Sequence, residues 1–420
     1  MKLHLLAILG IVFLAGCVSD TSKSPNNGVA INEFSVDPQT AEFGDTVRFF
    51  MDGENVGGTT AECVTTELFG LEGGWVNLDG SPFRPYFGAQ TIGVGGAVIG
   101  FRGFGIDIHK TDGKWGGSLI YTDQSVTGGK TIAVAFEGGD FSVGGSFFDI
   151  RTAVDNSFRQ FVSNYCNYIG NAYSGEIKFE PILSPPLAER NKPGQSFTAD
   201  WIVKPPLIPE GLKVDYPVTA RTSFFYTSNA QVNIPAFSKA EYKRRQDIGE
   251  QTQFPLDIVN THAAPIQVSI SRGASPIVVN TDVLPGLGDT GFETFNYLIE
   301  IQNIGQGYPL PFTNTESTKG LGPDVESGFM IATMSIAGPG ARFEDCLGQS
   351  GQQIVIGPDV VQNLVKLRSD NSAPFGCKIL IDKAAWQSTP AGTISITFNI
   401  LYRYYVDSHA TVTVIGPSRS

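Results

Sequence analysis

The sequence is poor in the residue that most metal sites and many enzymes depend on. It holds four histidines in 420 residues, His4, His109, His262 and His409, and they are isolated from one another. Neither a His-Glu-x-x-His nor a His-x-His motif occurs, so the sequence carries no zinc signature. We therefore expect no metal, no cofactor and no catalytic residues.

Basic residues are also scarce relative to acidic ones. Lys and Arg number 29 against 41 Asp and Glu, which gives a formal net charge of −12. A nucleic-acid-binding surface needs clustered cations, so this balance argues against a nucleic-acid partner. The run Lys243-Arg244-Arg245 follows Ser238 and Glu241, whose spacing matches a capping box. We interpret the run as part of a short polar helix rather than as a basic site.

One long apolar run is present, and it stands at the start of the sequence. Residues 1–17 combine an early Lys2, an apolar run from Leu5 to Phe13, and Leu14-Ala15-Gly16-Cys17. This order is typical of an export signal, and the run is too short for a bilayer span of about 20 residues. We predict a signal peptide over 1–16 and a polar tether over 17–28.

The last four residues of that run resemble the prokaryotic lipobox. Proteins with a lipobox are lipidated on the cysteine and cleaved just before it. The resemblance implies that Cys17 becomes the first residue of the mature chain and that its lipid attaches the protein to a membrane. It also implies a location at the cell surface or in the periplasm. The alternative is an ordinary secretory signal with a chance cysteine.

Four cysteines remain once Cys17 is set aside: Cys63, Cys166, Cys346 and Cys377. They allow three pairings, and the sequence alone does not choose between them. We favour one bridge in each half, Cys63 with Cys166 and Cys346 with Cys377, because of the internal repeat described below. Such bridges persist in an oxidising compartment. The alternative is four buried free thiols.

The residues that are abundant point to β-structure. The sequence has 49 Gly, 25 Pro, 29 Phe and 13 Tyr against 4 Met, a composition that favours short strands and many turns. From Val29 onward apolar and polar residues alternate; Val47, Phe49 and Met51 fall on one side of a predicted strand. A turn is predicted at Asp52-Gly53.

A glycine-rich stretch at about 73–150 is predicted to be a β-rich insertion. Most of its Gly pairs precede a few apolar or β-branched residues, as short strands between tight turns would. Its aromatic rings could stack on sugars or anchor a protein partner, although tryptophan in a β-sandwich usually belongs to the core. The candidate binding aromatics are Trp75, Tyr86, Phe101 and Trp115.

Two features occur once in each half and in the same order. A strand ends in Asn-x-Gly, at Asn55 and at Asn303, and is followed by a cysteine pair and by aromatic strands in which Tyr226 and Tyr405 take similar places. Asn followed two residues later by Gly is in itself a turn signal. The strand ending also resembles the CARDB-type, Ig-like repeats of archaeal and other prokaryotic surface proteins. That resemblance implies β-sandwich domains.

The sequence therefore predicts an all-β protein of two Ig-like antiparallel β-sandwich domains with few short helices. The predicted boundaries are 29–237 for the first domain with its insertion, 238–253 for a linker with a short helix, and 254–420 for the second domain. The predicted function is a lipid-anchored, non-catalytic structural or adhesive protein of the cell envelope, with an envelope protein or polysaccharide as partner. The alternative is a carbohydrate- or ligand-binding surface lipoprotein that serves a transporter or hydrolase.

Overall fold

The computed structural model describes residues 27–71, 74–83, 105–111, 114–123, 130–137, 159, 162–163, 166, 178–282, 291–310, 329–356, 365–367 and 371–417. These residues form mainly antiparallel β-sheets, so the predicted all-β sandwich class is confirmed. Within them, no helix is long and apolar enough to cross a membrane. The signal peptide and Cys17 lie outside the described residues, so their predicted roles stay predictions.

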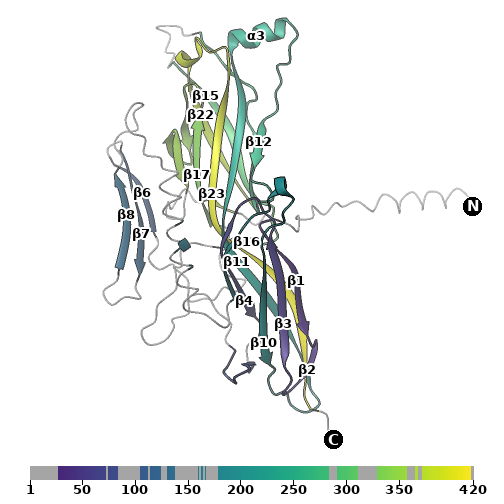
Figure 1. Ribbon diagram of the computed structural model, residues 1–420. Coiled ribbons are helices and arrows are strands. Elements are labelled where there is room, and N and C mark those ends of the chain that lie inside the picture. Colours follow the sequence, from purple (N-terminus) through teal and green to yellow (C-terminus); the bar gives the residue numbers. More distant parts are fainter. Residues whose placement is uncertain are drawn as a thin grey trace, which may run out of the picture.

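Two very long strands run side by side through the whole elongated body (Figure 1). Strand β11 spans Lys213–Ser238 and strand β23 spans Ala391–Ile415. They pair antiparallel at 25 consecutive positions, from Lys213 opposite Ile415 to Phe237 opposite Ala391. This pair is the centre of an 11-stranded sheet, which we call the shared sheet because both sandwiches use it.

The first sandwich packs a four-stranded sheet, in the order β1-β3-β10-β5, on one half of the shared sheet. The Sδ atom of Met51 in β3 lies 3.7 Å from the hydroxyl of Thr222 in β11. The ring of Trp75 meets those of Phe49 and Tyr216 edge to face, which fills the space between the layers. The strands are β1 (Val29–Asp37), β2 (Thr40–Glu42), β3 (Val47–Asn55), β4 (Ala61–Phe69), β5 (Val76–Asn77), β9 (Lys178–Leu183) and β10 (Ser196–Lys204), with a 3-10 turn at Ala188–Arg190.

The second sandwich packs a five-stranded sheet, in the order β13-β15-β22-β18-β19, on the other half of the shared sheet. Alternate residues of β15, such as Ile299 and Ile301, are fully buried in the same core as Ile394 and Ile396 of β23. The strands are β12 (Asp257–Asn260), β13 (Ile266–Arg272), β14 (Ile277–Val279), β15 (Phe292–Asn303), β16 (Tyr308–Leu310), β17 (Phe329–Ala337), β18 (Ala341–Cys346), β19 (Gln349–Gly351), β20 (Gln353–Ile356), β21 (Val365–Lys366) and β22 (Ser372–Asp382), with a 3-10 turn at Lys383–Trp386.

The two halves are related by an approximate two-fold rotation. Seven consecutive residues are buried at 220–226 in β11 and seven at 398–404 in β23, an offset of 178 at both ends (398 − 220 and 404 − 226). Phe225 and Arg403 obey the same offset and lie opposite each other in the ladder. The axis therefore passes through this pair. We call the region around it the waist.

Both Asn-x-Gly motifs lie at the waist and close equivalent loops. The Asn55 side chain accepts a hydrogen bond from the Gly57 amide and donates to the Thr59 carbonyl, and Asn303 does the same with Gly305 and Gly307. A Cβ atom at Gly57 would overlap the Tyr226 hydroxyl. The motif therefore needs glycine because a tyrosine of the shared sheet covers it.

This geometry corrects the predicted partner of Tyr226. The hydroxyl of Tyr404 donates to Asn303 Oδ1 at 2.8 Å and lies where a Cβ at Gly305 would be, as Tyr226 does at Gly57. Tyr404, and not Tyr405, is therefore the counterpart of Tyr226. The error of one residue matters because neighbouring residues in a strand point to opposite faces of the sheet.

The sandwiches are not joined by a linker at 238–253. Because β11 and β23 each cross the waist, the first sandwich includes the C-terminal half of β23, and the second includes the C-terminal half of β11. The predicted turn at Asp52-Gly53 is also wrong, since both residues belong to β3 and pair with β1 and β10. Gly53 is required there because a Cβ would meet the Phe197 ring.

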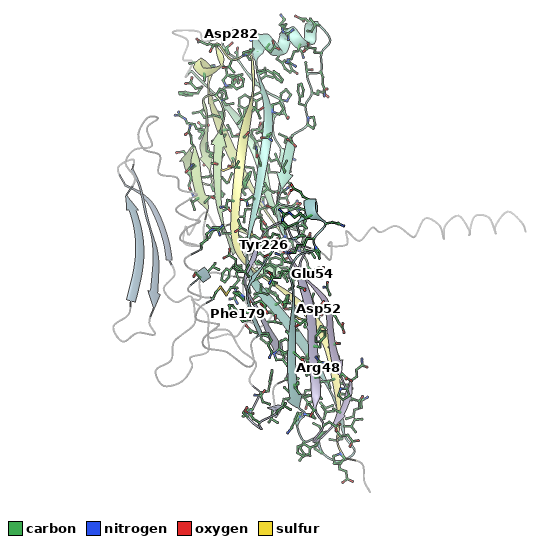
Figure 2. All side chains as sticks on the ribbon, viewed as in Figure 1. Arg48, Asp52, Glu54, Phe179, Tyr226 and Asp282 are labelled. Carbon is green, nitrogen blue, oxygen red and sulfur yellow. A yellow bond between two sulfur atoms is a disulfide. The ribbon has the colours of Figure 1, made fainter. Side chains whose placement is uncertain are left out.

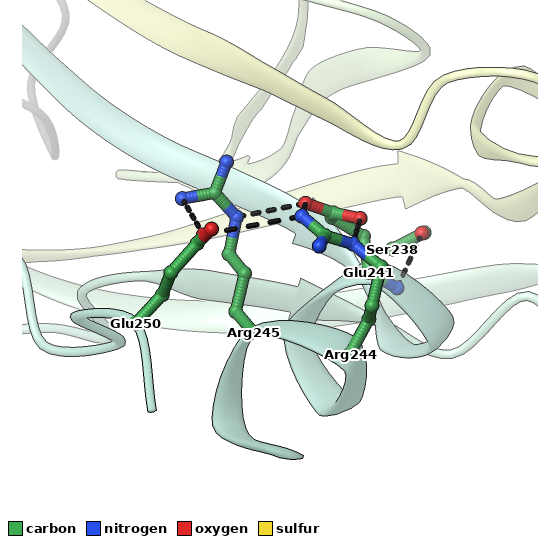
Figure 3. Close-up of polar contacts among 5 residues, drawn as sticks. All are labelled: Ser238, Glu241, Arg244, Arg245 and Glu250. Atoms are coloured by element: carbon green, nitrogen blue, oxygen red, sulfur yellow. Dashed lines mark hydrogen bonds and ion pairs between the residues drawn. The ribbon is translucent and has the colours of Figure 1, made fainter. Parts of the chain in front are cut away.

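Only the N-cap half of the predicted capping box is present, because the Ser238 amide donates to the Pro390 carbonyl and not to Glu241, and the helix lies at one tip of the molecule. Helix α3 (Lys239–Asp247) begins after Ser238, whose Oγ accepts from the Glu241 amide at 3.3 Å. Figure 3 shows Glu241 between Arg244 and Arg245, with Glu250 beside them. Hydrogen bonds from Arg244 and Arg245 lower the pKa of Glu241 to about 2. These arginines thus face carboxylates, as the interpretation of a polar helix requires.

The glycine-rich stretch contains a three-stranded antiparallel sheet of its own. Strands β6 (Gly105–Thr111), β7 (Lys114–Asp123) and β8 (Lys130–Glu137) pair in sequence order and are separate from the two sandwiches (Figure 1). The described part of this stretch is therefore β-structure, as its Gly and β-branched pattern predicts.

Candidate functional site

A cluster of charged and aromatic side chains occupies the outer face of the shared sheet at the waist. Thr222 and Phe224 of β11 point into the core, so the alternate residues of the strand point outward. The cluster comes from β4, β11 and β23, and we call it the waist cluster. Its members are Thr65, Glu67, Arg221, Ser223, Arg403, Tyr405 and Asp407.

Arg221 and Asp407 form a two-pronged ion pair across the central ladder. Nε and Nη2 of Arg221 donate to the two carboxylate oxygens of Asp407, each at 2.7 Å. The guanidinium also lies over the Tyr405 ring, 4.1 Å from its centroid. The side chains of the pair are 11% and 22% exposed, so solvent screens their attraction only weakly. The pair is a strong constraint on the register of β11 against β23.

Arg403 closes a second chain of polar contacts on the same face. Its Nη2 atom donates to the Ser223 hydroxyl at 2.9 Å, and that hydroxyl lies 2.8 Å from the hydroxyl of Thr65. Arg403, Ser223 and Thr65 come from β23, β11 and β4, and all three are buried. The contacts therefore link three strands at the two-fold axis.

Glu67 is a buried carboxyl between these two arginines. It is 4% exposed, and its Oε2 has no hydrogen-bond partner in the described structure. Burial raises the pKa of Glu67 to about 8, although the charges of Arg403 and Arg221 oppose the shift. The carboxyl is therefore largely protonated at neutral pH. Removing the ionised carboxylate from water costs more free energy than its attraction to the two arginines provides.

The waist cluster has the composition of a polar network that specifies strand pairing. Ion pairs, hydroxyl contacts and cation–π contacts all cross between strands there. None of these seven residues is among the site residues predicted from the sequence. The available signal was an arginine inside each aromatic strand, Arg221 in TARTSFFY and Arg403 in NILYRYY, where a central strand would otherwise be apolar.

A groove of about 330 Å³ lies beside the first sandwich, lined by β5, β9 and β10 and the turn after β5. Lys178 and Asp200 contribute opposite charges to it, and burial lowers the pKa of Lys178 while Asp200 opposes that shift. The volume suits a small ligand. The residues that line it are Asn77, Leu78, Asp79, Phe83, Lys178, Asp200, Trp201, Ile202 and Val203.

The predicted binding aromatics are not brought together in the described structure. Trp75 is 1% exposed and packs in the core of the first sandwich, so its ring is not available as a surface platform. Trp115 lies in β7, of which only the backbone is described. Tyr86 and Phe101 lie outside the described residues.

The cysteines pair as favoured from the repeat. Cys63 is joined to Cys166 and Cys346 to Cys377, with Cα separations of 5.3 and 4.3 Å. The two bridges are not equivalent under the two-fold relation, because Cys63 lies in the shared sheet and Cys346 in the five-stranded sheet. Within the described residues, no group of three or more His, Cys, Asp or Glu side chains could hold a metal ion.

No protein-family model matches this chain, and no curated protein matches it. Among solved structures it is similar to a collagen adhesin from S. aureus, at 10% identity over 94% of each chain with a TM-score of 0.14. It is also similar to the adhesin ACE of Enterococcus faecalis, described as binding its ligands by the collagen hug model. That match has 8% identity over 92% of this chain and 95% of the other, with a TM-score of 0.12. At these TM-scores the matches carry no argument about this protein.

Proposed function

We propose that this protein is a non-catalytic, lipid-anchored structural or adhesive rod of the cell envelope, attached to the membrane through Cys17. The observation that carries the proposal is the pairing of β11 and β23 at 25 consecutive positions through both sandwiches. Two domains on a linker would move independently, whereas two domains built on the same pair of strands move together. The result is a stiff, elongated body that can hold a partner at a fixed place.

The waist supports this role because it resists bending. A hinge there would have to expose the seven-residue buried runs of both long strands and separate the pair of Arg221 and Asp407. Exposing buried apolar surface costs about 25 cal/mol per Å², and a separated buried ion pair adds to that cost. A partner would be an envelope protein or polysaccharide.

The test of this proposal compares the wild-type protein with Cys17→Ser in the cells that make it. We expect the wild type in the membrane fraction, with a mass that begins at Cys17 plus acyl chains, and Cys17→Ser in the soluble extracytoplasmic fraction. An unlipidated wild-type chain that still begins at Met1 would refute the anchor and the location.

A second candidate function is capture of a small ligand, and the groove beside the first sandwich favours it. Lys178, Asp79 and Asp200 offer polar groups of both signs along its wall. The test is binding of the mature protein to an array of envelope polysaccharide fragments, with Lys178→Met and the matched exposed control Lys213→Met. Saturable binding that only Lys178→Met weakens would favour capture, and absence of binding would favour the structural role.

A further inference from the structure

The chain enters the rod at its waist and not at an end. The Nδ2 atom of Asn27 donates to the Ile304 carbonyl at 3.4 Å, and the Gly28 amide donates to the Ala263 carbonyl at 2.8 Å. The Gly28 carbonyl accepts from Val56 at 2.8 Å. Val56 belongs to the first sandwich and Ile304 to the second, so loops of both sandwiches hold the point at which the tether begins.

The position of this point along the rod follows from its contact with β11. A Cβ at Gly28 would lie 3.4 Å from Cζ of Phe224, which is the twelfth of the 26 residues of β11. Phe224 lies eleven positions after Lys213 and fourteen positions before Ser238. At ~3.3 Å per residue, the ends of β11 lie ~36 and ~46 Å from the entry point.

The tether is too short to let this rod stand on the membrane. Asn27 lies ten positions after Cys17, and in any conformation this length of chain spans at most ~36 Å. An upright rod would hold the entry point ~36 Å above the bilayer on its shorter side and ~46 Å on its longer side. A rod that stood on its shorter half would need a fully extended tether. The loops beyond Lys213 would raise the entry point further above the bilayer.

We infer that the rod lies tilted or side-on, with its waist against the bilayer to which Cys17 is attached. This inference rests on the lipid anchor of the proposed function. The contact surface consists of three loops around the entry point, which we call the waist loops: 56–60, 261–265 and 304–307. It faces the headgroup layer of a phospholipid membrane.

The charge of the waist loops fits this partner. None of their residues is Asp, Glu, Lys or Arg, although the protein as a whole has a net charge of −12. Anionic headgroups repel an acidic surface, so these neutral loops meet less repulsion at a membrane than an acidic surface would. Its exposed members include Gly58, His262 and Gln306.

The orientation of the rod also determines which face of the shared sheet points away from the membrane. Phe224 points toward Gly28 and hence toward the bilayer, whereas Arg221, Ser223 and Arg403 lie on the opposite face of the shared sheet. The face of the shared sheet that carries the waist cluster is therefore turned away from the membrane.

Neutron reflectometry of the intact lipoprotein in a supported bilayer with 20% phosphatidylglycerol tests the inference. We expect the centre of the protein layer within ~36 Å of the headgroups. A variant with 20 Gly and Ser residues inserted between Ser24 and Pro25 gains up to ~72 Å of reach and should form a thicker layer. The double change His262→Glu and Gln306→Glu should move the layer outward, whereas Gln253→Glu, remote from the waist loops, should leave it in place.

The outcomes separate this inference from the proposed function. A lipidated protein whose layer is as thick as the ~83 Å length of β11 would overturn the orientation and leave the anchor intact. No shift on lengthening the tether would also overturn it. A protein that carries no lipid and does not bind the bilayer would refute the anchor, and the orientation with it.

Discussion

The waist and the ends of the rod use the same two strands in different ways. Toward their ends, β11 and β23 alternate between exposed or half-buried and buried residues, whereas at 220–226 and 398–404 both faces are buried. Figure 2 shows Tyr226 at the waist and Arg48 toward one end of the first sandwich. An alternating strand needs only an apolar face, but a strand buried on both faces must also find a partner for every polar group it carries.

Two ion pairs of the same type make this difference measurable. Arg48 in β3 donates to Asp200 in β10 with three contacts of 2.7 to 3.1 Å, a geometry much like that of Arg221 and Asp407. The Arg48 and Asp200 side chains are 53% and 42% exposed, against 11% and 22% at the waist. The two pairs have the same chemistry and differ in their exposure to solvent, so the comparison isolates the effect of burial.

A large loss of folding stability is expected when one member of the ion pair at the waist is removed. Arg221→Met should lower the free energy of unfolding by ~1.5–3 kcal/mol, because it leaves the half-buried Asp407 carboxylate without its guanidinium. Arg48→Met should cost no more than ~1 kcal/mol, because water solvates Asp200. Guanidinium-chloride denaturation measures both values. Equal losses for the two variants would show that burial at the waist is not what gives the pair its strength.

Another change in folding stability is expected at Glu67, and its size depends on pH. The pKa of Glu67 is raised by burial from 4.5 to about 8, so the folded state binds a proton that the unfolded state releases between these values. Folding stability from this group is therefore present below pH 4.5 and is lost as the pH rises toward 8. Glu67→Gln removes the titration and should stabilise the protein increasingly over that interval, by up to ~5 kcal/mol at pH 9.

Thermal unfolding of the Glu67→Gln variant at pH 5, 7 and 9 provides the measurement. Glu33→Gln, at an exposed position of β1, controls for the loss of a carboxylate as such. A gain for Glu67→Gln that stays constant across the three pH values would exclude a protonated Glu67 in the fold.

A smaller effect is expected for the asparagine that closes a waist loop. Asn303→Ala removes the hydrogen bonds with Gly305, Gly307 and Tyr404 and leaves their polar groups buried, at a cost of ~2–3 kcal/mol. Asn296→Ala, at an exposed position of the same strand β15, should change the free energy of unfolding by less than ~0.5 kcal/mol. Urea denaturation distinguishes the two, and similar losses would mean that the loop closes without its asparagine.

Local sequence signals were reliable where one face of a segment is buried. The alternation at Val47, Phe49 and Met51, the helix N-cap at Ser238 and the Asn-x-Gly endings all correspond to structure. The predicted turn at Asp52-Gly53 failed because glycine is needed there for the close approach of the Phe197 ring within a strand. A glycine that makes room for a distant side chain looks the same in the sequence as a glycine that turns the chain.

The sequence by itself determined the all-β class, the alternating strand through Val47, Phe49 and Met51, and the internal repeat, because these follow from residue periodicity and turn chemistry over a few neighbours. Only the tertiary structure decided that the two halves share β11 and β23 and that Tyr404 is the structural counterpart of Tyr226. It also decided that Glu67, Arg221 and Arg403 lie together on one face of the shared sheet. Those facts depend on contacts between residues more than 100 positions apart in the chain, such as Tyr404 with Asn303 and Arg221 with Asp407. Such pairing is fixed by the fit of the whole sheet against its core, since a shift of one residue would turn the waist cluster inward and the core outward.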